Sequence, residues 1–414
     1  MRDKILYYAT IILSVFGLVM IYSSSYVWAS YKFNNAFKYV INQGIFLILG
    51  IILMTILSKI DSCFYKKYSN YLLLFTFILL VLVLIPGIGV VRNGSRSWFG
   101  IASFGFQPSE ISKLSLVIFV SKYLERNDAL KRVTSKFVFP ILGLILLFFL
   151  LILLEPDFGT GMIIVFSLIV LIFITGTNLS IFVRLGILGI VGIIGLIIVA
   201  PYRLKRIISF VNPWSDPLGS GFQIIQSLYA IGPGGLLGQG FLNSRQKHFY
   251  LPEPQTDFIF SIISEEFGFL GVLIVSVLFI VIFYRCIKTA LETENLFDKY
   301  LVFGLSFMLI FQTLLNLSVV VGLVPVTGVT LPFISYGGSS LLTSFMMIGI
   351  ILGISNKNKW ICSLYWYILW KWMQKSASRS KKWVQKGASW NKKWVQKGAK
   401  LMKIRVFLLK IWYN

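Results

Sequence analysis

The sequence has little charge. Charged residues make up 13% of its 414 positions, whereas hydrophobic residues make up 57%, and the mean hydropathy is +0.81. Soluble globular domains carry roughly 25% charged residues, so this composition excludes an ordinary soluble domain. The chain is predicted to be an all-α polytopic membrane protein.

Cysteine and histidine are also scarce. The three cysteines, Cys63, Cys286 and Cys362, lie far apart and imply no disulfide framework. A single histidine, His248, and the absence of His/Cys clusters argue against a zinc or haem centre. There is no Walker-type phosphate loop and no credible dinucleotide fingerprint, so a substrate is expected to bring its own leaving group.

What the sequence has in abundance is long apolar stretches. We predict about ten membrane spans, because each stretch approaches or reaches the roughly 20 residues that cross a bilayer as a helix. The stretches lie near 5–25, 44–58, 71–90, 108–121, 138–154, 159–176, 180–200, 258–283, 300–323 and 334–354. Lys and Arg gather in alternate loops, which predicts that these loops and both termini are cytoplasmic. Residues 1–355 are expected to form the membrane domain and residues 356–414 a cytoplasmic tail.

Most of the unusual polar residues fall on the opposite, extracytoplasmic side. They occur in 91–100, 106–114, 155–161, 201–257 and 324–340. Glu110 and Lys113 lie three residues apart on one helical face, after a proline suited to a helix start. Such a pair inside a span is costly unless it is paired or faces a polar cavity. A structural ion pair and a cavity lining are both open readings.

The segment 201–257 is too long for a simple connection, and long ordered loops are usually functional. Its Gln223 and Gln226 share a helical face, which favours a short amphipathic or re-entrant helix. Cations are clustered in the same segment, namely Arg203, Lys205, Arg206, Arg245 and Lys247. They indicate a ligand that carries phosphate, and contact with anionic lipid headgroups is the alternative.

Asp257 ends this segment and directly precedes an apolar run, where we expect it to start a helix. At about 100° per residue, Ser261 and Ser264 lie near its face, Glu265 lies at the margin and Glu266 points away. An acid at a helix N-terminus is often only a favourable partner of the helix dipole. The glutamines, glycines and cations around Asp257 favour a functional role, because a helix cap does not require them.

Several stretches together resemble the SEDS family (shape, elongation, division and sporulation), which includes FtsW, RodA and SpoVE. They are "RSWFG", "FQPSEISKL", "EPDFGTG", "NPWSDPLGSGFQIIQSL", "SRQKHFYLPEPQTDFIFSIISEEFGFLG" and "VPVTGVTLPFISYGGSSLL". The resemblance covers about residues 5–355. The sequences "SRQK" and "YLPEPQTDFIF" are more similar to the division and sporulation members than to the elongation type.

The resemblance implies a ten-helix peptidoglycan glycosyltransferase that polymerises lipid II on the outer face of the bacterial cytoplasmic membrane. A class B penicillin-binding protein is the implied transpeptidase partner, together with divisome or related cell-wall proteins. The acid of the "TDFIF" motif is taken as catalytic in that family, and here it is Asp257. A lipid II flippase is the runner-up, and a scaffold for division proteins is a third reading.

As a hypothesis, Asp257 is the general base of an inverting displacement, and cations stabilise the departing pyrophosphate. A divalent cation, Mg²⁺ or Mn²⁺, could bridge phosphate and carboxylate, although no sequence pattern demonstrates one. By their matching motifs, the resemblance implies that Arg96, Trp98, Glu110, Lys113 and Asp157 line the central cavity. The other expected substrate-binding or pyrophosphate-binding residues are Arg203, Arg206, Gln223, Gln226, Arg245, Lys247 and Glu265.

The tail contains a repeat that the family resemblance does not cover. "KWMQKSA" at 371–377 is followed by "KWVQKGA" at 382–388 and 393–399, a period of 11 residues that aligns the tryptophans on one helical face. We expect an amphipathic basic helix on anionic lipid of the inner leaflet, and a cytoplasmic protein partner is the alternative. Much of the +24 net charge lies here, so that charge is poor evidence for a nucleic-acid partner, and none is predicted.

Overall fold

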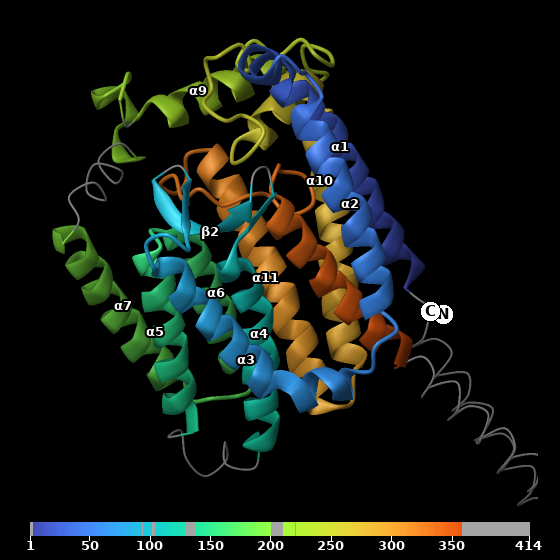
Figure 1. Cartoon of the computed structure of the whole chain (residues 1–414), viewed down its shortest axis with the longest axis vertical. Coiled ribbons are helices and arrows are strands. Elements are labelled where there is room, and N and C mark those ends of the chain that lie inside the picture. The colour runs from blue at the N-terminus through green and yellow to red at the C-terminus, as the bar shows by residue number, and fades with distance from the viewer. Residues whose placement is uncertain are drawn as a thin grey trace, which may run out of the picture. The chain divides into compact units, whose positions relative to one another are not determined.

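The computed structural model describes residues 3–92, 94–101, 104–128, 137–199, 210–219 and 221–357. Within them the chain is mostly helical (Figure 1). The helices are α1 Lys4–Phe33, α2 Lys38–Leu57, α3 Ser62–Leu84, α4 Pro108–Arg126, α5 Val138–Leu154, α6 Phe158–Ile174, α7 Leu179–Val199, α9 Phe222–Ile231, α10 Ile259–Glu292, α11 Leu296–Val320 and Gly338–Lys357. The tail repeats at 371–399 lie outside the described residues.

Six of these helices are long and apolar enough to cross a membrane: α1, α2, α3, α10, α11 and Gly338–Lys357. Three shorter apolar helices lie within α5, α6 and α7. Every predicted span overlaps a helix, so the prediction of a mostly helical multi-pass membrane protein is confirmed. The number of spans and the cytoplasmic position of the termini stay predictions.

Helix α4 differs from its neighbours because it is polar and buried. It contacts α3, α6 and α11, and Ser109, Glu110, Ser112, Lys113 and Ser115 are all at most 5% exposed. Buried polar side chains are costly unless they find partners, so a helix with five of them requires a polar network around it.

The segment that follows α3 is a small antiparallel sheet, in a region for which only polar character was predicted. Strand β1 is Val90–Arg92, β2 is Ser95–Ile101 and β3 is Phe104–Phe106. Trp98 on β2 lies opposite Val90, and Phe99 lies opposite Phe106. The sheet leads directly into α4 and contacts α3 and α4. It therefore places the "RSWFG" motif beside the polar helix.

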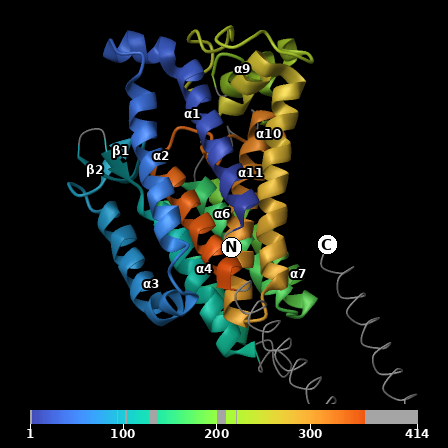
Figure 2. The same cartoon turned by 90° about the vertical axis from the view of Figure 1, so that its right-hand side faces the viewer.

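The long segment before α10 gathers at one end of the helices, opposite the α10–α11 turn (Figures 1 and 2). It contains the predicted short amphipathic helix, α9, and two 3-10 turns, Pro213–Ser215 and Gly232–Gly234. Ser227 on α9 fixes the helix, because its hydroxyl lies 2.8 Å from Ser261 Oγ and donates to Val320 O at 2.7 Å. Helix α10 begins at Ile259, so Asp257 lies just before the helix that it was expected to start.

Helix α10 is broken at Gly268, which has φ 61° and ψ −157°. Two of its backbone N–H groups donate to loop carbonyls instead of to the helix: Phe269 N to Gly235 O at 2.9 Å and Leu270 N to Leu236 O at 3.1 Å. In exchange, Gln239 N and Gly240 N donate to the carbonyls of residues 265 and 266, at 2.8 and 3.0 Å. The glycine-rich loop is thus hydrogen-bonded into the break, and the backbone groups that the break exposes are satisfied.

Candidate functional site

A cavity of about 770 Å³ lies next to α4, the sheet and the segment that ends at Asp257. Several chain segments that are far apart in sequence form its wall. The lining residues include Tyr39, Ser97, Trp98, Gln107, Glu110, Asp157, Thr160, Gln223, Glu253, Gln255, Asp257, Thr327, Gly328, Thr330, Tyr336 and Ser340. Five of the predicted site residues are among them: Trp98, Glu110, Asp157, Gln223 and Asp257. The structure therefore brings these five to one cavity.

The backbone of Asp257 is fixed by a side chain from α11. Asn316 Nδ2 donates to Asp257 O at 2.8 Å and to Val329 O at 2.7 Å. The same bonds bring the segment around Gly328 close to the carboxylate, because a Cβ built on Gly328 would lie 3.8 Å from Asp257 Oδ2. Asn316 thus holds together two segments that both line the cavity.

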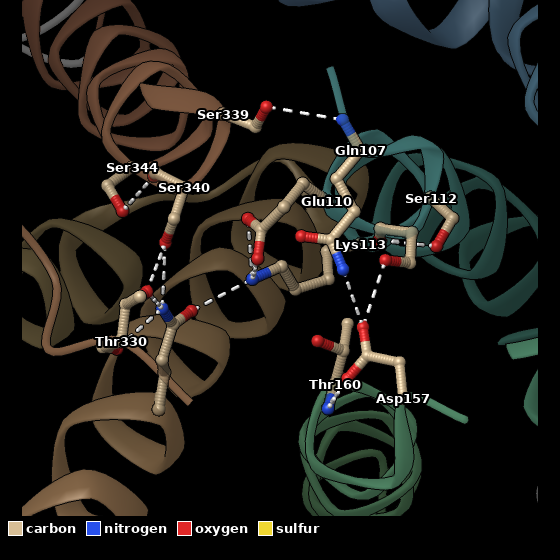
Figure 3. Close-up of polar contacts among 12 residues, drawn as sticks. Gln107, Glu110, Ser112, Lys113, Asp157, Thr160, Thr330, Ser339, Ser340 and Ser344 are labelled. Atoms are coloured by element: carbon tan, nitrogen blue, oxygen red, sulfur yellow. Dashed lines mark hydrogen bonds and ion pairs between the residues drawn. The ribbon is translucent and has the colours of Figure 1, made fainter. Parts of the chain in front are cut away.

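Asp157 begins α6 and joins it to α4 (Figure 3). Its Oδ1 accepts from Thr160 N at 3.1 Å, which is a helix N-cap. Its Oδ2 accepts from Gln107 Nε2 at 2.8 Å and from Ser109 Oγ at 3.2 Å. Two of these three donors, Gln107 and Ser109, come from the start of α4.

Glu110 and Lys113 form the ion pair that their spacing predicted. Lys113 Nζ lies 2.8 Å from Glu110 Oε1 and Oε2 and donates to Gln312 Oε1 at 2.9 Å. Gln312 Nε2 then donates to Thr330 O and to Ser340 Oγ, both at 3.0 Å (Figure 3). Glu110 lines the cavity, whereas Lys113 is 1% exposed and lies behind the wall. Glu110 and Lys113 therefore form a structural ion pair and also contribute, through Glu110, to the lining of the cavity.

Five further predicted residues lie on described segments but do not line the cavity. Arg96 Nη1 donates weakly to Leu84 O at 3.5 Å, and Gln226 is half-buried on α9. Arg245 is exposed, whereas Lys247 and Glu265 are buried. None of these five is among the lining residues of the cavity. Arg203 and Arg206 lie outside the described residues.

The buried glutamates of α10 bind the loop that precedes Asp257. Glu265 accepts from Ser244 Oγ at 2.5 Å and from Arg245 N at 2.7 Å. Glu266 accepts from Lys247 Nζ at 2.7 Å and from Ser23 Oγ at 2.6 and 2.7 Å. Both buried acids therefore have protein partners, and Lys247 is one of them.

The sequence reading missed several residues of this site. Tyr39, Gln255 and Tyr336 line the cavity but were not among the predicted site residues, although Gln255 lies in "YLPEPQTDFIF" and Tyr336 in "VPVTGVTLPFISYGGSSLL". Glu155 does not line the cavity and is fully buried, and neither of its carboxylate oxygens has a hydrogen-bond partner among the residues that the structure describes. Burial, together with the nearby Asp157, raises the pKa of Glu155 to about 9. Glu155 is therefore neutral at pH 7.

No group of three or more His, Cys, Asp or Glu side chains that could hold a metal ion occurs among the described residues. The carboxylates that line the cavity, those of Glu110, Asp157, Glu253 and Asp257, are the available protein ligands. Mg²⁺ in phosphate-processing sites is commonly held by one or two carboxylates together with substrate phosphates. The residues present fit that arrangement better than an all-protein metal site.

Comparison with known proteins agrees with these motifs. The family model for FtsW, RodA and SpoVE, described as cell cycle protein, matches residues 3–360. Stage V sporulation protein E of Bacillus subtilis is 48% identical over 360 residues, covering 86% of this chain and 98% of that protein. A probable peptidoglycan glycosyltransferase FtsW of Geobacter sp. is 39% identical, covering 86% of this chain and 97% of that protein.

Two solved structures have the same fold. One, described as showing structural coordination of polymerization and crosslinking by a peptidoglycan synthase complex, matches with TM-score 0.71 and 30% identity over 86% of this chain and 98% of the matched chain. RodA of Thermus thermophilus matches with TM-score 0.62 and 27% identity, over 86% of this chain and 97% of that chain. The lower identity to RodA than to the sporulation and FtsW proteins agrees with the predicted subgroup. The chain belongs to the FtsW, RodA and SpoVE family.

Proposed function

We propose that the protein is a peptidoglycan glycosyltransferase that polymerises lipid II at the cavity, on the outer face of the cytoplasmic membrane. One observation carries the proposal: the carboxylate-bearing residue Asp257 lines a polar cavity of about 770 Å³ together with Glu110 and Asp157. A cavity with a few convergent polar groups is the usual form of a small-molecule site. The relatives named as peptidoglycan glycosyltransferases support the choice of reaction.

In this reaction Asp257 accepts the proton of the acceptor sugar 4-hydroxyl. The hydroxyl oxygen attacks the anomeric carbon of the donor, the bond from that carbon to the pyrophosphate oxygen breaks, and the configuration inverts. Polyprenyl pyrophosphate leaves with the bonding electron pair. General-base help of this kind is worth about 10²–10⁴ in rate. Asn316 fixes the backbone of the base, and so contributes to its position.

The departing pyrophosphate needs cations to stabilise its charge. The candidate cations differ in whether they are already paired with a carboxylate. Lys113 and Lys247 are paired with buried glutamates, whereas Arg245 is exposed. Breaking a buried ion pair to bind a ligand is costly. Among the described cations, Arg245 is therefore a better candidate than Lys113 or Lys247, and Arg203 and Arg206 are further candidates. A divalent cation held by Asp257 or Asp157 and the pyrophosphate would supply additional charge stabilisation.

We also propose protein and lipid partners. A class B penicillin-binding protein would crosslink the strands that this protein makes, and the structural match to a peptidoglycan synthase complex supports that pairing. Divisome or related cell-wall proteins would direct where synthesis occurs. Residues 356–414 would adhere to anionic lipid of the inner leaflet.

A lipid II flippase is the alternative that one observation favours. Transporters often use discontinuous helices, and α10 is broken at Gly268. The break is filled by a loop that is hydrogen-bonded on both sides, and the cavity lies beside the Asp257 segment at the end of α10. This placement favours chemistry at one surface over alternating access.

Purified protein with its penicillin-binding partner and labelled lipid II provides the test. Long glycan strands resolved on a gel are the expected product. Translocation of labelled lipid II in proteoliposomes without strand formation would instead establish the flippase. If neither strand formation nor translocation is observed while the partner is bound, the protein acts as a scaffold and the proposal is overturned.

A further inference from the structure

Two tyrosines from distant parts of the chain form a corner in the cavity. Tyr39 lies in the first turn of α2, and Tyr336 lies just before the helix Gly338–Lys357. Their ring centroids are 4.9 Å apart and the ring planes meet at 88°. Both rings are half-buried, and both line the same cavity as Asp257. Two perpendicular aromatic surfaces therefore face the space beside the proposed base.

Backbone hydrogen bonds fix this corner relative to Asp257. Tyr336 N donates to Gln255 O at 2.8 Å, two residues before Asp257. Gln43, which is 2% exposed, holds the other side: its Nε2 donates to Ser335 O at 3.1 Å and its Oε1 accepts from Gly337 N at 3.2 Å. Gln43 lies one helical turn after Tyr39 on α2, so both rings are held by one clamp.

The chemistry of the corner suits a sugar ring. A pyranose has faces of C–H groups, which pack on the electron-rich face of an aromatic ring, and an edge of hydroxyl groups, which need hydrogen-bond partners. Gln255 and Thr327 line the same cavity, and the buried Gln255 Oε1 and Thr327 Oγ1 have no hydrogen-bond partner among the described residues. Unsatisfied buried acceptors are rare, and sugar hydroxyl groups would satisfy them.

An interfacial aromatic belt does not account for this pair. Belt residues lie on the outer surface, where they face lipid or headgroups; Tyr31, which is 78% exposed, is an example of a tyrosine on that surface. Tyr39 and Tyr336 instead keep their partial exposure toward a cavity lined by Glu253, Gln255 and Asp257. Core packing alone would bury the rings, and it would not leave polar acceptors unpaired beside them.

We propose that the Tyr39–Tyr336 corner binds a hexose ring of the lipid-linked disaccharide, beside Asp257. This inference rests on the proposed function, because that function supplies the sugar. Tyr39 and Tyr336 bind the C–H face of the ring, and Gln255 and Thr327 bind its hydroxyl groups. The corner is thus a specificity element for the sugar and contributes nothing to recognition of the pyrophosphate.

The test measures binding in the Asp257→Asn background, where turnover does not interfere. Tyr39→Leu and Tyr336→Leu are each titrated with lipid II and with polyprenyl pyrophosphate, which lacks the sugar. Loss of one aromatic contact should weaken lipid II binding roughly tenfold and leave polyprenyl pyrophosphate binding unchanged. Tyr336→Phe keeps the ring and should keep most of the affinity. Tyr31→Leu is the matched control outside the cavity and should bind both ligands like the parent.

The two ligands separate the outcomes. If binding of both ligands is weakened equally, or if lipid II binds as tightly as to the parent, the corner does not bind the sugar. This holds even if the wild-type protein makes glycan strands. Selective loss of lipid II binding would support the corner even if the wild-type protein makes no strands, in which case only the proposed reaction fails. Each variant must retain the melting temperature of the parent, which shows that the change acts on the ligand.

Discussion

Lys247 Nζ lies 2.7 Å from Glu266 Oε1, and both side chains are fully buried. The pair connects the loop that precedes Asp257 to α10, and Ser23 connects the same carboxylate to α1. Lys247 Nζ also lies 5.0 Å from the ring centroid of Tyr26. A cation that the sequence reading assigned to pyrophosphate therefore has a set of protein partners.

Removing one member of this pair should be costly. Lys247→Met leaves a buried carboxylate without its cation, which typically costs about 3–5 kcal/mol. The double variant Lys247→Met/Glu266→Gln should recover much of that loss. Thermal unfolding in detergent measures both. Lys66→Met at the partly exposed Lys66–Glu125 pair is the control, and should cost no more than about 1 kcal/mol. Equal losses in the two single variants would contradict a buried pair.

Glu155 should make stability depend on pH. Its pKa is raised to about 9 from 4.5 by burial and by Asp157, so between these values the folded state binds more protons than the unfolded state. The contribution of Glu155 to the free energy of unfolding is therefore fully present below pH 4.5 and is lost as the pH rises toward 9. Glu155→Gln removes the dependence. The variant should melt at an increasingly higher temperature than wild type from pH 6 to pH 9, and a constant difference would contradict the assignment.

Gly268 should not tolerate a side chain. Its φ and ψ lie in a region that is essentially restricted to glycine, which costs other residues about 1–3 kcal/mol. A Cβ there would also collide with the backbone of the inserted loop at Gly234, Leu236 and Gly238. Gly268→Ala should lower the melting temperature by several degrees. Gly143→Ala on α5, where a Cβ meets nothing within 4 Å, should be neutral, and the same result at both positions would refute the inserted loop.

The tail should act on membrane adhesion and not on catalysis. Deleting residues 370–414 removes the Lys-rich repeats, each charge of which is worth roughly 1 kcal/mol near anionic lipid. Polymerisation of lipid II by the truncated protein should stay at the wild-type level. Co-flotation of a tail peptide with anionic liposomes, compared with neutral liposomes, measures adhesion directly. Equal binding to both would favour a cytoplasmic protein partner.

Local patterns predicted the features that depend on neighbours in sequence. Apolar runs predicted the helices, and the three-residue spacing of Glu110 and Lys113 predicted their ion pair. The Asn93-Gly94 dipeptide is a hairpin signal that could have predicted β1 and β2, since Arg92 pairs with Ser95. The polarity of the segment by itself carries no strand signal.

Contacts between distant segments could not be predicted in the same way. Lys247 and Glu266 were assigned by charge and by helix face, but their pairing depends on how the loop folds back onto α10. Tyr39 and Tyr336 are separated by most of the chain, and nothing local marks them as neighbours. Gly268 carries no sequence signal of its φ, because glycine in an apolar helix is common in membrane spans.

The central claim is that Asp257 is the base of a glycan polymerase. The most direct measurement compares wild type with Asp257→Asn, each purified with its penicillin-binding partner, in polymerisation of labelled lipid II. The substitution keeps the shape of the side chain but removes its basic carboxylate, so the rate should fall by about 10²–10⁴ while lipid II binding and thermal stability remain. Glycan strands formed at the wild-type rate by Asp257→Asn would contradict the account.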